Sequence, residues 1–416
     1  MRVSVIGQGY VGLPLTMALV EAGHTVLAVE SDPNRLAALR RAQSYIVDVS
    51  DEALSQALAT RRFTPVPDLQ GQQHSDVYLI TVPTPVNADD EPDLRYLDGA
   101  LDTAAQTAQP GALVIVESTL YPGATRGHAV PRFEARSRLR SGIDVHFAYS
   151  PERIDPGRDD SYVEIPKIVG GIDTQGALLA SSFYETVFKK VITVSSAEIA
   201  EYVKLFENIF RYVNIAFVNE LSQSARAMNI DLREVVAAAS SKPYGFMPFS
   251  HGPGVGGHCL PNNIHYLNHA LRGAGRSSSI LTACTQVNNG VANYVADRIE
   301  QALQAAGKSV ATASVLILGL AYKPGIADDR LAPTYAISAE LAGRGAHVKV
   351  ADPHVPAAVA GEHFTRVELT AAQAAAADIV VIATDHKDFD YGLVLDHAPL
   401  IFDCRGRFDS QRVEQL

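Results

Sequence analysis

Short apolar runs alternate with longer stretches of mixed polarity over the first half of the chain. The runs most typical of strands are Val3–Ile6, Thr25–Val29, Val77–Thr81, Leu113–Glu117 and Val145–Tyr149. Each ends near glycine or polar residues, and helix-length stretches lie between them. This alternation predicts a doubly wound domain over residues 1–195, with a parallel sheet and ligands at the carboxyl edge of its strands.

A long helical segment follows. Ser195–Glu198 forms a capping box, and a helical pattern continues from it to about Met228. Its apolar residues lie nearly all round the helix: Ile199, Tyr202, Val203, Phe206, Ile209, Phe210, Val213, Phe217 and Leu221. A helix of this kind is buried on several sides, so we expect it to join domains and line a subunit interface. Asp231 and Glu234 then open another helix, and residues 196–300 form a central helical domain.

The strand-and-helix alternation returns over residues 301–416. Strands are expected at Val315–Leu318, Val348–Ala351, Ile379–Ala383 and Leu400–Phe402. The first of these runs into Gly319–Lys323, which lacks a dinucleotide fingerprint, so we expect a different ligand here, with Lys323 available for a phosphate. The expected fold is therefore α/β, with two doubly wound Rossmann-like domains joined by a central helical domain that contains one long helix.

Composition excludes several functional classes. The 416 residues carry a formal charge of −11, with 47% hydrophobic and 19% charged residues, as in a well-buried globular protein. The acidic balance argues against a nucleic-acid partner, and no apolar run approaches a membrane span. Three widely spaced cysteines, Cys259, Cys284 and Cys404, form no metal cluster. We therefore expect a cytoplasmic protein without a metal.

A glycine-rich motif directly follows the first predicted strand. Gly7-Gln-Gly9-Tyr10-Val11-Gly12 permits a tight turn and a close approach of pyrophosphate at a helix N-terminus. The second strand ends at Glu30, where a carboxylate binds ribose hydroxyls and repels a 2′-phosphate, which favours NAD over NADP. Arg35 weakens that preference, since it can pair with phosphate or stack on adenine. The alternative is a purely structural turn.

A second glycine-rich segment, Gly252–Pro261, contains Cys259. A thiol can add to an aldehyde, and the resulting thiohemiacetal can lose a second hydride to become a thioester. Together with a nicotinamide site, Cys259 therefore predicts oxidation beyond the aldehyde. The alternative is a cysteine that is simply a small buried apolar residue.

Polar residues at other positions complete the candidate site. Lys204 and Asn208 share one face of the long helix and are placed to stabilise an oxyanion, the alternative being a salt bridge such as Lys204 with Glu207. Glu152 follows a strand end, where an acid/base carboxylate is expected, although alone it would more often be a solvated loop residue. Thr84 and Thr119 also follow strands, and their hydroxyls either bind a cofactor or cap helices.

These motifs together resemble the UDP-glucose/GDP-mannose dehydrogenase family along the whole chain. The matching stretches are Gly7–Gly12, Val82–Pro85, Glu117–Thr119, Ser150–Glu152, Lys204–Asn208, Gly256–Pro261 and Gly319–Lys323. The resemblance implies an NAD-binding N-terminal domain, a helical centre that forms a homodimer or higher homo-oligomer, and a C-terminal UDP-sugar domain. It also implies oxidation of a sugar C6 alcohol to a carboxylate with two NAD⁺, in polysaccharide or glycoconjugate biosynthesis.

The resemblance also assigns roles. Cys259 is the expected nucleophile, Lys204 and Asn208 stabilise the oxyanion, Glu152 positions or activates water, and Thr119 holds the catalytic water or substrate. Expected cofactor contacts add Thr84, Thr119 and Arg330 to the glycine-rich turn, Glu30 and Arg35. Expected substrate contacts are Glu152, Arg153, Lys204, Asn208, Phe249, His251, Gly256, Gly257 and Lys323.

Local details resemble the branch that oxidises UDP-N-acetylhexosamines. The segments concerned are Pro151–Gly157, Tyr121–Gly123, Lys242–Phe246 and Ala383–His386. They favour UDP-N-acetylglucosamine as the substrate, ahead of UDP-N-acetylmannosamine and UDP-glucose.

The chain departs from the family at two places. Asn262 and Asn263 follow Cys-Leu-Pro, where the family has an aspartate two residues on that is thought to help activate the hydrolytic water. An amide cannot take up the proton, so Asn263 leaves open a protein that binds without turnover, or a two-electron or epimerising reaction. The second departure surrounds Arg330, which itself is retained.

Overall fold

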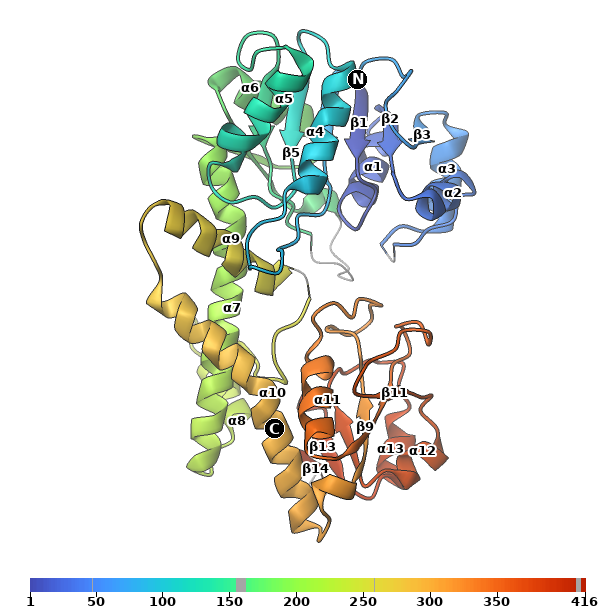
Figure 1. The fold of residues 1–416 in the computed structure, drawn as a ribbon, viewed down its shortest axis with the longest axis vertical. Helices are drawn as coiled ribbons and strands as arrows, with labels where there is room; N and C mark the ends of the chain where they lie inside the picture. The colour runs from blue at the N-terminus through green and yellow to red at the C-terminus, as the bar shows by residue number, and fades with distance from the viewer. Residues whose placement is uncertain (47, 155–161, 258, 409–412) are drawn as a thin grey trace. The chain divides into compact units, whose positions relative to one another are not determined.

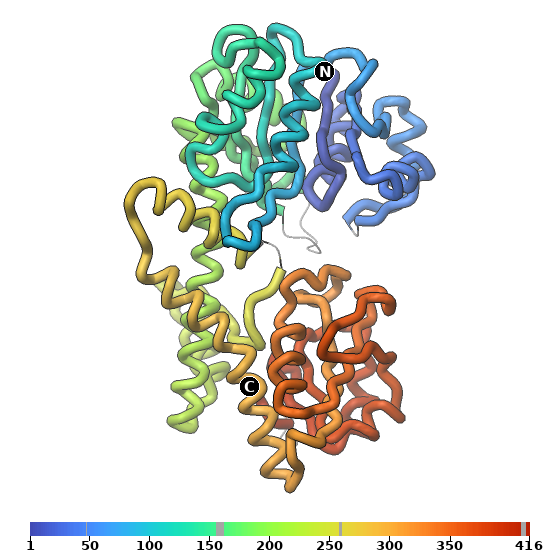
Figure 2. Tube along the Cα trace, viewed as in Figure 1, coloured from blue at the N-terminus to red at the C-terminus, as the bar shows by residue number. Residues whose placement is uncertain are grey.

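The structure is a computed structural model that describes residues 1–46, 48–154, 162–257, 259–408 and 413–416, although not the side chain of Cys259. The chain forms two compact units (Figures 1 and 2). The first unit contains residues 1–207 and 262–277, and the second contains 208–261 and 278–416. Helices α7 (Ala197–Ala227) and α9 (Cys259–Gly273) each have residues in both units. The division at residues 195 and 300 stays a prediction.

The first unit is built on an eight-stranded sheet with the order β3-β2-β1-β4-β5-β6-β7-β8. Its strands are β1 (Arg2–Ile6), β2 (Thr25–Val29), β3 (Phe63–Val66), β4 (Val77–Ile80), β5 (Leu113–Val116), β6 (His146–Tyr149), β7 (Lys167–Gly171) and β8 (Val191–Val194). Neighbours pair in parallel except β6 and β7, which are antiparallel. The sequence prediction of a parallel sheet therefore holds for all strand pairs but this one.

The reversal at β7 determines which residues meet at the edge of the sheet. Tyr149 at the end of β6 pairs with Gly170 near the end of β7. Because the two strands run in opposite directions, Lys167 at the start of β7 lies beyond the carboxyl end of β6. A strand start thus reaches the edge at which β5 and β6 end.

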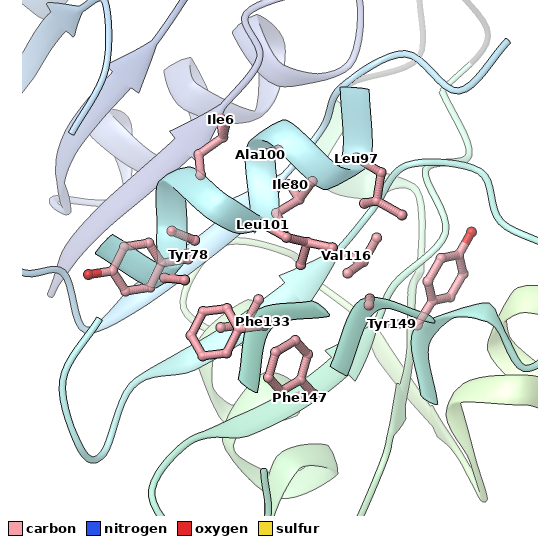
Figure 3. Close-up of a cluster of buried hydrophobic side chains, with 14 of the residues drawn as sticks. Ile6, Tyr78, Ile80, Leu97, Ala100, Leu101, Val116, Phe133, Phe147 and Tyr149 are labelled. Carbon is pink, nitrogen blue, oxygen red and sulfur yellow. The ribbon is translucent and has the colours of Figure 1, made fainter. Parts of the chain in front are cut away.

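Helices cover both faces of this sheet because successive strand residues point to opposite sides. Their bounds are α1 (Gly12–Glu21), α2 (Pro33–Arg40), α3 (Asp51–Ala59), α4 (Arg95–Thr107), α5 (Val130–Ser137) and α6 (Thr174–Tyr184), with short helices η1 (Thr125–Ala129) and η2 (Tyr162–Glu164). Tyr78 and Ile80 face the core formed with α4 and α5, shown in Figure 3. Val77 and Leu79 face the opposite core, formed with α1, α3 and α6. Two buried layers result, as a doubly wound fold requires.

The second unit contains a six-stranded, all-parallel sheet with the order β11-β10-β9-β12-β13-β14. Its strands are β9 (Ser314–Leu318), β10 (His347–Ala351), β11 (Thr365–Arg366), β12 (Ile379–Ile382), β13 (Ile401–Asp403) and β14 (Val413–Gln415). Its helices are α8 (Leu232–Ala239), α10 (Ser279–Ala305), α11 (Pro333–Gly343), α12 (Ala371–Ala376), α13 (Tyr391–His397) and the short η3 (Val310–Thr312). The predicted fold class is confirmed. No helix in the described part of the chain is both long and apolar enough to cross a membrane.

Candidate active site

The glycine-rich turn after β1 has the geometry of a phosphate site. Gly7 has a φ of +99°, and a Cβ at Gly12 would lie 1.8 Å from the Gly7 carbonyl oxygen. A Cβ at Gly9, in contrast, would meet no atom within 4 Å. Gly7 and Gly12 are therefore required by the turn itself, whereas Gly9 borders open space. Helix α1 begins here without a side-chain cap, so its first N–H groups suit a pyrophosphate.

Glu30 lies where a ribose-binding acid is expected. Its buried carboxylate follows β2 and accepts hydrogen bonds from the backbone N–H groups of Gln8, at 3.2 Å, and Asp32, at 2.9 Å. A carboxylate can accept about four hydrogen bonds, so Glu30 keeps capacity for a ribose diol. The exposed Arg35 lies over the ring of Tyr45, 5.3 Å from its centroid. The residues of this turn therefore fit NAD.

The structure brings Thr84 and Thr119 together at the edge of β4 and β5. The Thr84 hydroxyl donates to the Thr119 carbonyl oxygen at 2.9 Å. Tyr266 on α9 in turn donates to the carbonyl oxygen of Thr84 at 3.0 Å. Helix α9 is thus fixed to the sheet edge through Tyr266, a residue that the sequence did not single out. On the same helix, the Nδ2 of the buried Asn263 has no hydrogen-bond partner among the described residues.

Lys204 on α7 is held by the loop that follows β6. Its Nζ donates to the carbonyl oxygen of Glu152 at 2.5 Å. The predicted alternative, a salt bridge with Glu207, is wrong, because the Glu207 carboxylate pairs with Arg153 at 2.6 Å. Arg153 also donates from Nη1 to the carbonyl oxygen of Pro166. The Arg153 guanidinium, an expected substrate contact, is therefore engaged by the protein.

Asn208 follows Lys204 by about one turn of α7. The residue is 9% exposed, and its Nδ2 lacks a hydrogen-bond partner among the residues described. A buried amide without a partner costs free energy unless a ligand supplies an acceptor. Asn208 is therefore suited to a carbonyl or alkoxide oxygen.

The Glu152 carboxylate is turned into the protein. Its Oε1 accepts from the N–H groups of Arg153 and Ile154, both at 2.7 Å. Its Oε2 accepts from the Tyr162 hydroxyl at 2.8 Å and from the Lys167 ammonium at 3.2 Å. Glu152 is therefore a buried residue and not a solvated loop residue.

Lys167 bridges two buried acids. Its Nζ lies 2.6 Å from Oε2 of Glu117, the residue after β5, and Tyr184 also donates to that carboxylate. Burial raises the pKa of Glu117, and the nearby charge of Glu152 adds to this effect. Lys167 acts in the opposite direction but does not outweigh burial. Burial likewise acts to raise the pKa of Glu152, but Lys167, Tyr162 and the Ile154 amide outweigh it and hold this pKa below its usual value. Sequence reasoning missed Lys167, although Glu117, an acid directly after an apolar central strand, already required a buried partner.

In the second unit, the glycines before Cys259 pack against the loop after β9. The N–H of Gly257 donates to the carbonyl oxygen of Arg330 at 2.9 Å. A Cβ at Gly256 would lie 2.7 Å from the Cβ of Tyr322, and one at Gly257 would lie 2.8 Å from its ring. The Arg330 side chain pairs with Asp328 at 2.5 Å. Only glycine at these two positions allows so close a contact with Tyr322, the neighbour of Lys323 in the sequence.

The remaining predicted substrate residues are also in the second unit. The Phe249 ring lies 6.0 Å from that of Phe210 on α7, centroid to centroid. Burial lowers the pKa of His251, against a hydrogen bond to the Leu416 backbone. Lys323 is half-buried. The Cys259 side chain and residues 155–157 of the Pro151–Gly157 motif lie outside the described part of the structure.

The first unit thus has the features of a dinucleotide-binding dehydrogenase, and comparison with known proteins makes this class more specific. The chain belongs to the UDP-glucose/GDP-mannose dehydrogenase family. Models of the family's NAD binding, central and UDP binding domains match residues 1–189, 198–290 and 316–410. The protein is accordingly an NAD-dependent nucleotide-sugar dehydrogenase with a UDP-sugar substrate.

Individual relatives span nearly the whole chain. A Pseudomonas aeruginosa UDP-N-acetyl-D-glucosamine 6-dehydrogenase is 36% identical, covering 94% of this chain and 91% of the relative. A Pyrococcus horikoshii UDP-N-acetyl-D-mannosamine dehydrogenase is 33% identical, covering 94% and 90%. The solved structure of a UDP-D-ManNAc dehydrogenase from P. horikoshii has a TM-score of 0.90 at 29% identity, covering 100% of this chain and 99% of the other.

Proposed function

We propose that this enzyme oxidises the C6 alcohol of a UDP-N-acetylhexosamine to the carboxylate, with UDP-N-acetylglucosamine as the preferred substrate. The similarity to the P. aeruginosa relative and the Pro151–Gly157 motif support this choice. UDP-N-acetylmannosamine is the second candidate, supported by the P. horikoshii relative, and UDP-glucose is the third. The product would be a nucleotide-activated uronic acid, suited to polysaccharide synthesis.

The proposed reaction removes four electrons in two steps. The Gly7–Gly12 turn and Glu30 would hold NAD⁺, which would supply the hydride acceptor for each oxidation. The alcohol first loses a hydride and a proton to give an aldehyde. The Cys259 thiolate then adds to the carbonyl carbon, and loss of the second hydride converts the thiohemiacetal into a thioester. Water releases the carboxylate and the thiol.

The observation that carries this proposal is the pair of donors on α7. Lys204 presents an ammonium and Asn208 an unpartnered, buried amide, about one helical turn apart. Such donors stabilise the alkoxide that forms when a thiolate attacks a carbonyl, because they need no reorientation during the reaction. We assign to Thr119, whose carbonyl oxygen accepts from Thr84 at the sheet edge, the role of holding water or substrate.

The test is a panel of UDP-sugars assayed by NADH formation, with mass analysis of the product. Two NADH per sugar and an acid product are expected, with UDP-N-acetylglucosamine consumed fastest. One NADH would indicate a two-electron enzyme, and binding without NADH a protein that has lost turnover. In Cys259→Ser, acid formation should nearly vanish while NAD⁺ and UDP-sugar still bind. Near-normal acid formation by this variant would contradict the mechanism.

We also infer a homodimer formed through α7. One face of this helix exposes large apolar residues: Ile199, Tyr202, Phe206, Phe210, Phe217 and Leu221. A continuous apolar face of this kind is typical of a protein interface. Sedimentation should give twice the chain mass, and Phe206→Asp should shift the enzyme towards the monomer. A monomeric wild type would contradict this inference.

A further inference from the structure

The Glu152 carboxylate already accepts four hydrogen bonds from described residues of the protein. A carboxylate offers about four lone-pair positions. In this structure the amides of Arg153 and Ile154 occupy two of them, and Tyr162 and Lys167 occupy the others. A general base must form a hydrogen bond with the water whose proton it removes. The arrangement therefore opposes that role for Glu152.

The charge state of Glu152 agrees with this geometry. A general base works best when its pKa lies near the working pH. Lys167, Tyr162 and the Ile154 amide hold the pKa of Glu152 below its usual value in spite of burial. A carboxylate stabilised in this way is a weak proton acceptor at neutral pH. Its charge instead stabilises the buried Lys167 ammonium.

The backbone of Glu152 makes the contact that matters for the proposed chemistry. Its carbonyl oxygen accepts from the Nζ of Lys204 at 2.5 Å. We infer that Glu152 is a positioning residue: its side chain, held by Lys167 and Tyr162, fixes its own backbone, whose carbonyl oxygen orients the Lys204 ammonium. The inference rests on the proposed function only in so far as Lys204 acts on the substrate.

Lys167 and Glu117 complete the group of buried residues that holds the Glu152 side chain. Lys167 is 4% exposed and contacts both carboxylates, so its charge is the one that holds the Glu152 side chain in place. Glu117 binds the far side of the same ammonium, and Tyr184 donates to it. Glu152 is thus supported from the end of β5 and, about 50 residues further along the chain, from β7 and α6.

The first experiment needs no substrate. Lysines are acetylated with limiting acetic anhydride, and the extent at Lys204 is read by peptide mass spectrometry. Tyr162→Phe removes one hydrogen bond to Glu152 with little change in volume, and Glu152→Gln removes the charge. In both variants we expect Lys204 to be acetylated about fivefold faster, because its ammonium would be held less firmly and the loss of one hydrogen bond corresponds to about that factor. Glu164→Gln, an exposed acid in the same short helix as Tyr162, is the matched control and should leave Lys204 unchanged.

The second experiment separates positioning from water activation. With the UDP-sugar that the panel identifies, the first-turnover rate of NADH formation in Tyr162→Phe should fall about tenfold, with the Kd for the UDP-sugar within about twofold of wild type. No additional acyl adduct should accumulate on Cys259. Lys167→Arg, which keeps the charge and both acidic partners, should retain most of the rate, whereas Lys167→Met should not.

Two results would overturn the inference. Unchanged Lys204 labelling in both Tyr162→Phe and Glu152→Gln would show that the loop does not orient the ammonium. A normal first-turnover rate with a new acyl adduct on Cys259 in Glu152→Gln would make Glu152 the base for hydrolysis. Should wild-type enzyme form no NADH with any UDP-sugar, the proposed function fails, while the labelling still decides the positioning role.

Discussion

Asp352 occupies in the second unit the position that Glu30 occupies in the first. Each acid directly follows the strand that pairs with the first strand of its sheet, β10 and β2 respectively. Glu30 accepts two backbone hydrogen bonds and keeps capacity for a ligand. The Asp352 carboxylate accepts from the amides of Leu320, Ala321, His354 and Val355 and from the ring of His386. Only Glu30 therefore remains able to bind a ribose.

Glu30 should set cofactor choice. NAD⁺ should exceed NADP⁺ in kcat/KM by at least about tenfold, because a 2′-phosphate would meet the Glu30 charge. Glu30→Gln should reduce this ratio, and Glu21→Gln, an exposed acid at the end of α1, should not. Equal kcat/KM values of the wild type with NAD⁺ and NADP⁺ would contradict the assignment of Glu30 as the ribose-binding acid.

Asn263 should slow the release of product. Without a carboxylate at this position, hydrolysis of the thioester should lag behind hydride transfer, giving a burst of NADH and then a slow steady state. General-base catalysis contributes about 10²–10⁴-fold, so the lag should be visible in stopped flow. Mass spectrometry should find a sugar-acyl adduct on Cys259.

The matched variants at this position are Asn263→Asp and Asn262→Asp. The first should shorten the lifetime of the adduct, whereas the second places the same charge one residue away and should not. Linear turnover without an adduct, in an enzyme shown to make the acid, would mean that water is activated elsewhere.

Gly257→Ala should disrupt the segment that leads to Cys259. The residue has a φ of +82°, and an added methyl group would lie 2.8 Å from the Tyr322 ring. Strain and overlap together should cost about 1–3 kcal/mol of unfolding free energy and lower kcat at least tenfold. Denaturant melts and initial rates measure these effects. Gly273→Ala, at the end of α9 with no neighbour within 4 Å of the added atom, is the control and should leave both nearly unchanged.

Stability should fall as the pH rises from about 5 to 8, because of Glu201 on α7. The fully buried carboxylate accepts from Gly123 and Thr125, yet burial raises its pKa from 4.5 to about 7. A raised folded-state pKa means that the folded protein binds the proton more tightly than the unfolded chain does. The stabilising contribution is therefore complete below 4.5 and lost as the pH passes 7.

The loss amounts to at most about 3 kcal/mol of unfolding free energy. Urea melts across this pH range would measure it, and Glu201→Gln should flatten the dependence. Glu220→Gln, an exposed acid on the same helix, should not. A wild-type profile without this decline would contradict the prediction.

Much of the architecture was predictable from local pattern. Five strands of the first unit lie within one residue of their predicted ends, because buried central strands are continuous apolar runs. The long helix was predicted as Ser195 to about Met228 and spans Ala197–Ala227. Strands β3, β7 and β8 were missed, since β3 contains Pro65, β7 begins with a lysine and ends with two glycines, and β8 is a four-residue edge strand.

The site was less accessible to sequence reasoning, for a different reason. Motif spacing identified Glu30, Thr84, Thr119, Lys204 and Asn208, which all lie at strand ends or on one helix. Pairings between distant segments carry no local signal, and so Lys167, Tyr162 and Tyr266 were missed. The alternative that paired Glu207 with Lys204 was wrong for the same reason, because its actual partner, Arg153, lies 54 residues away in the sequence.

The antiparallel strand β7 limits how this active site could be engineered into another protein fold. In a sheet whose strands all run one way, every strand start lies at the edge opposite the ligands, so a lysine there could never reach Glu117 and Glu152. Copying the acids after β5 and β6 and the donors on α7 into a uniformly parallel scaffold would therefore leave two buried acids without their cation. A transferred site would therefore have to include the antiparallel strand β7 as far as Gly171, in addition to the sequence motifs.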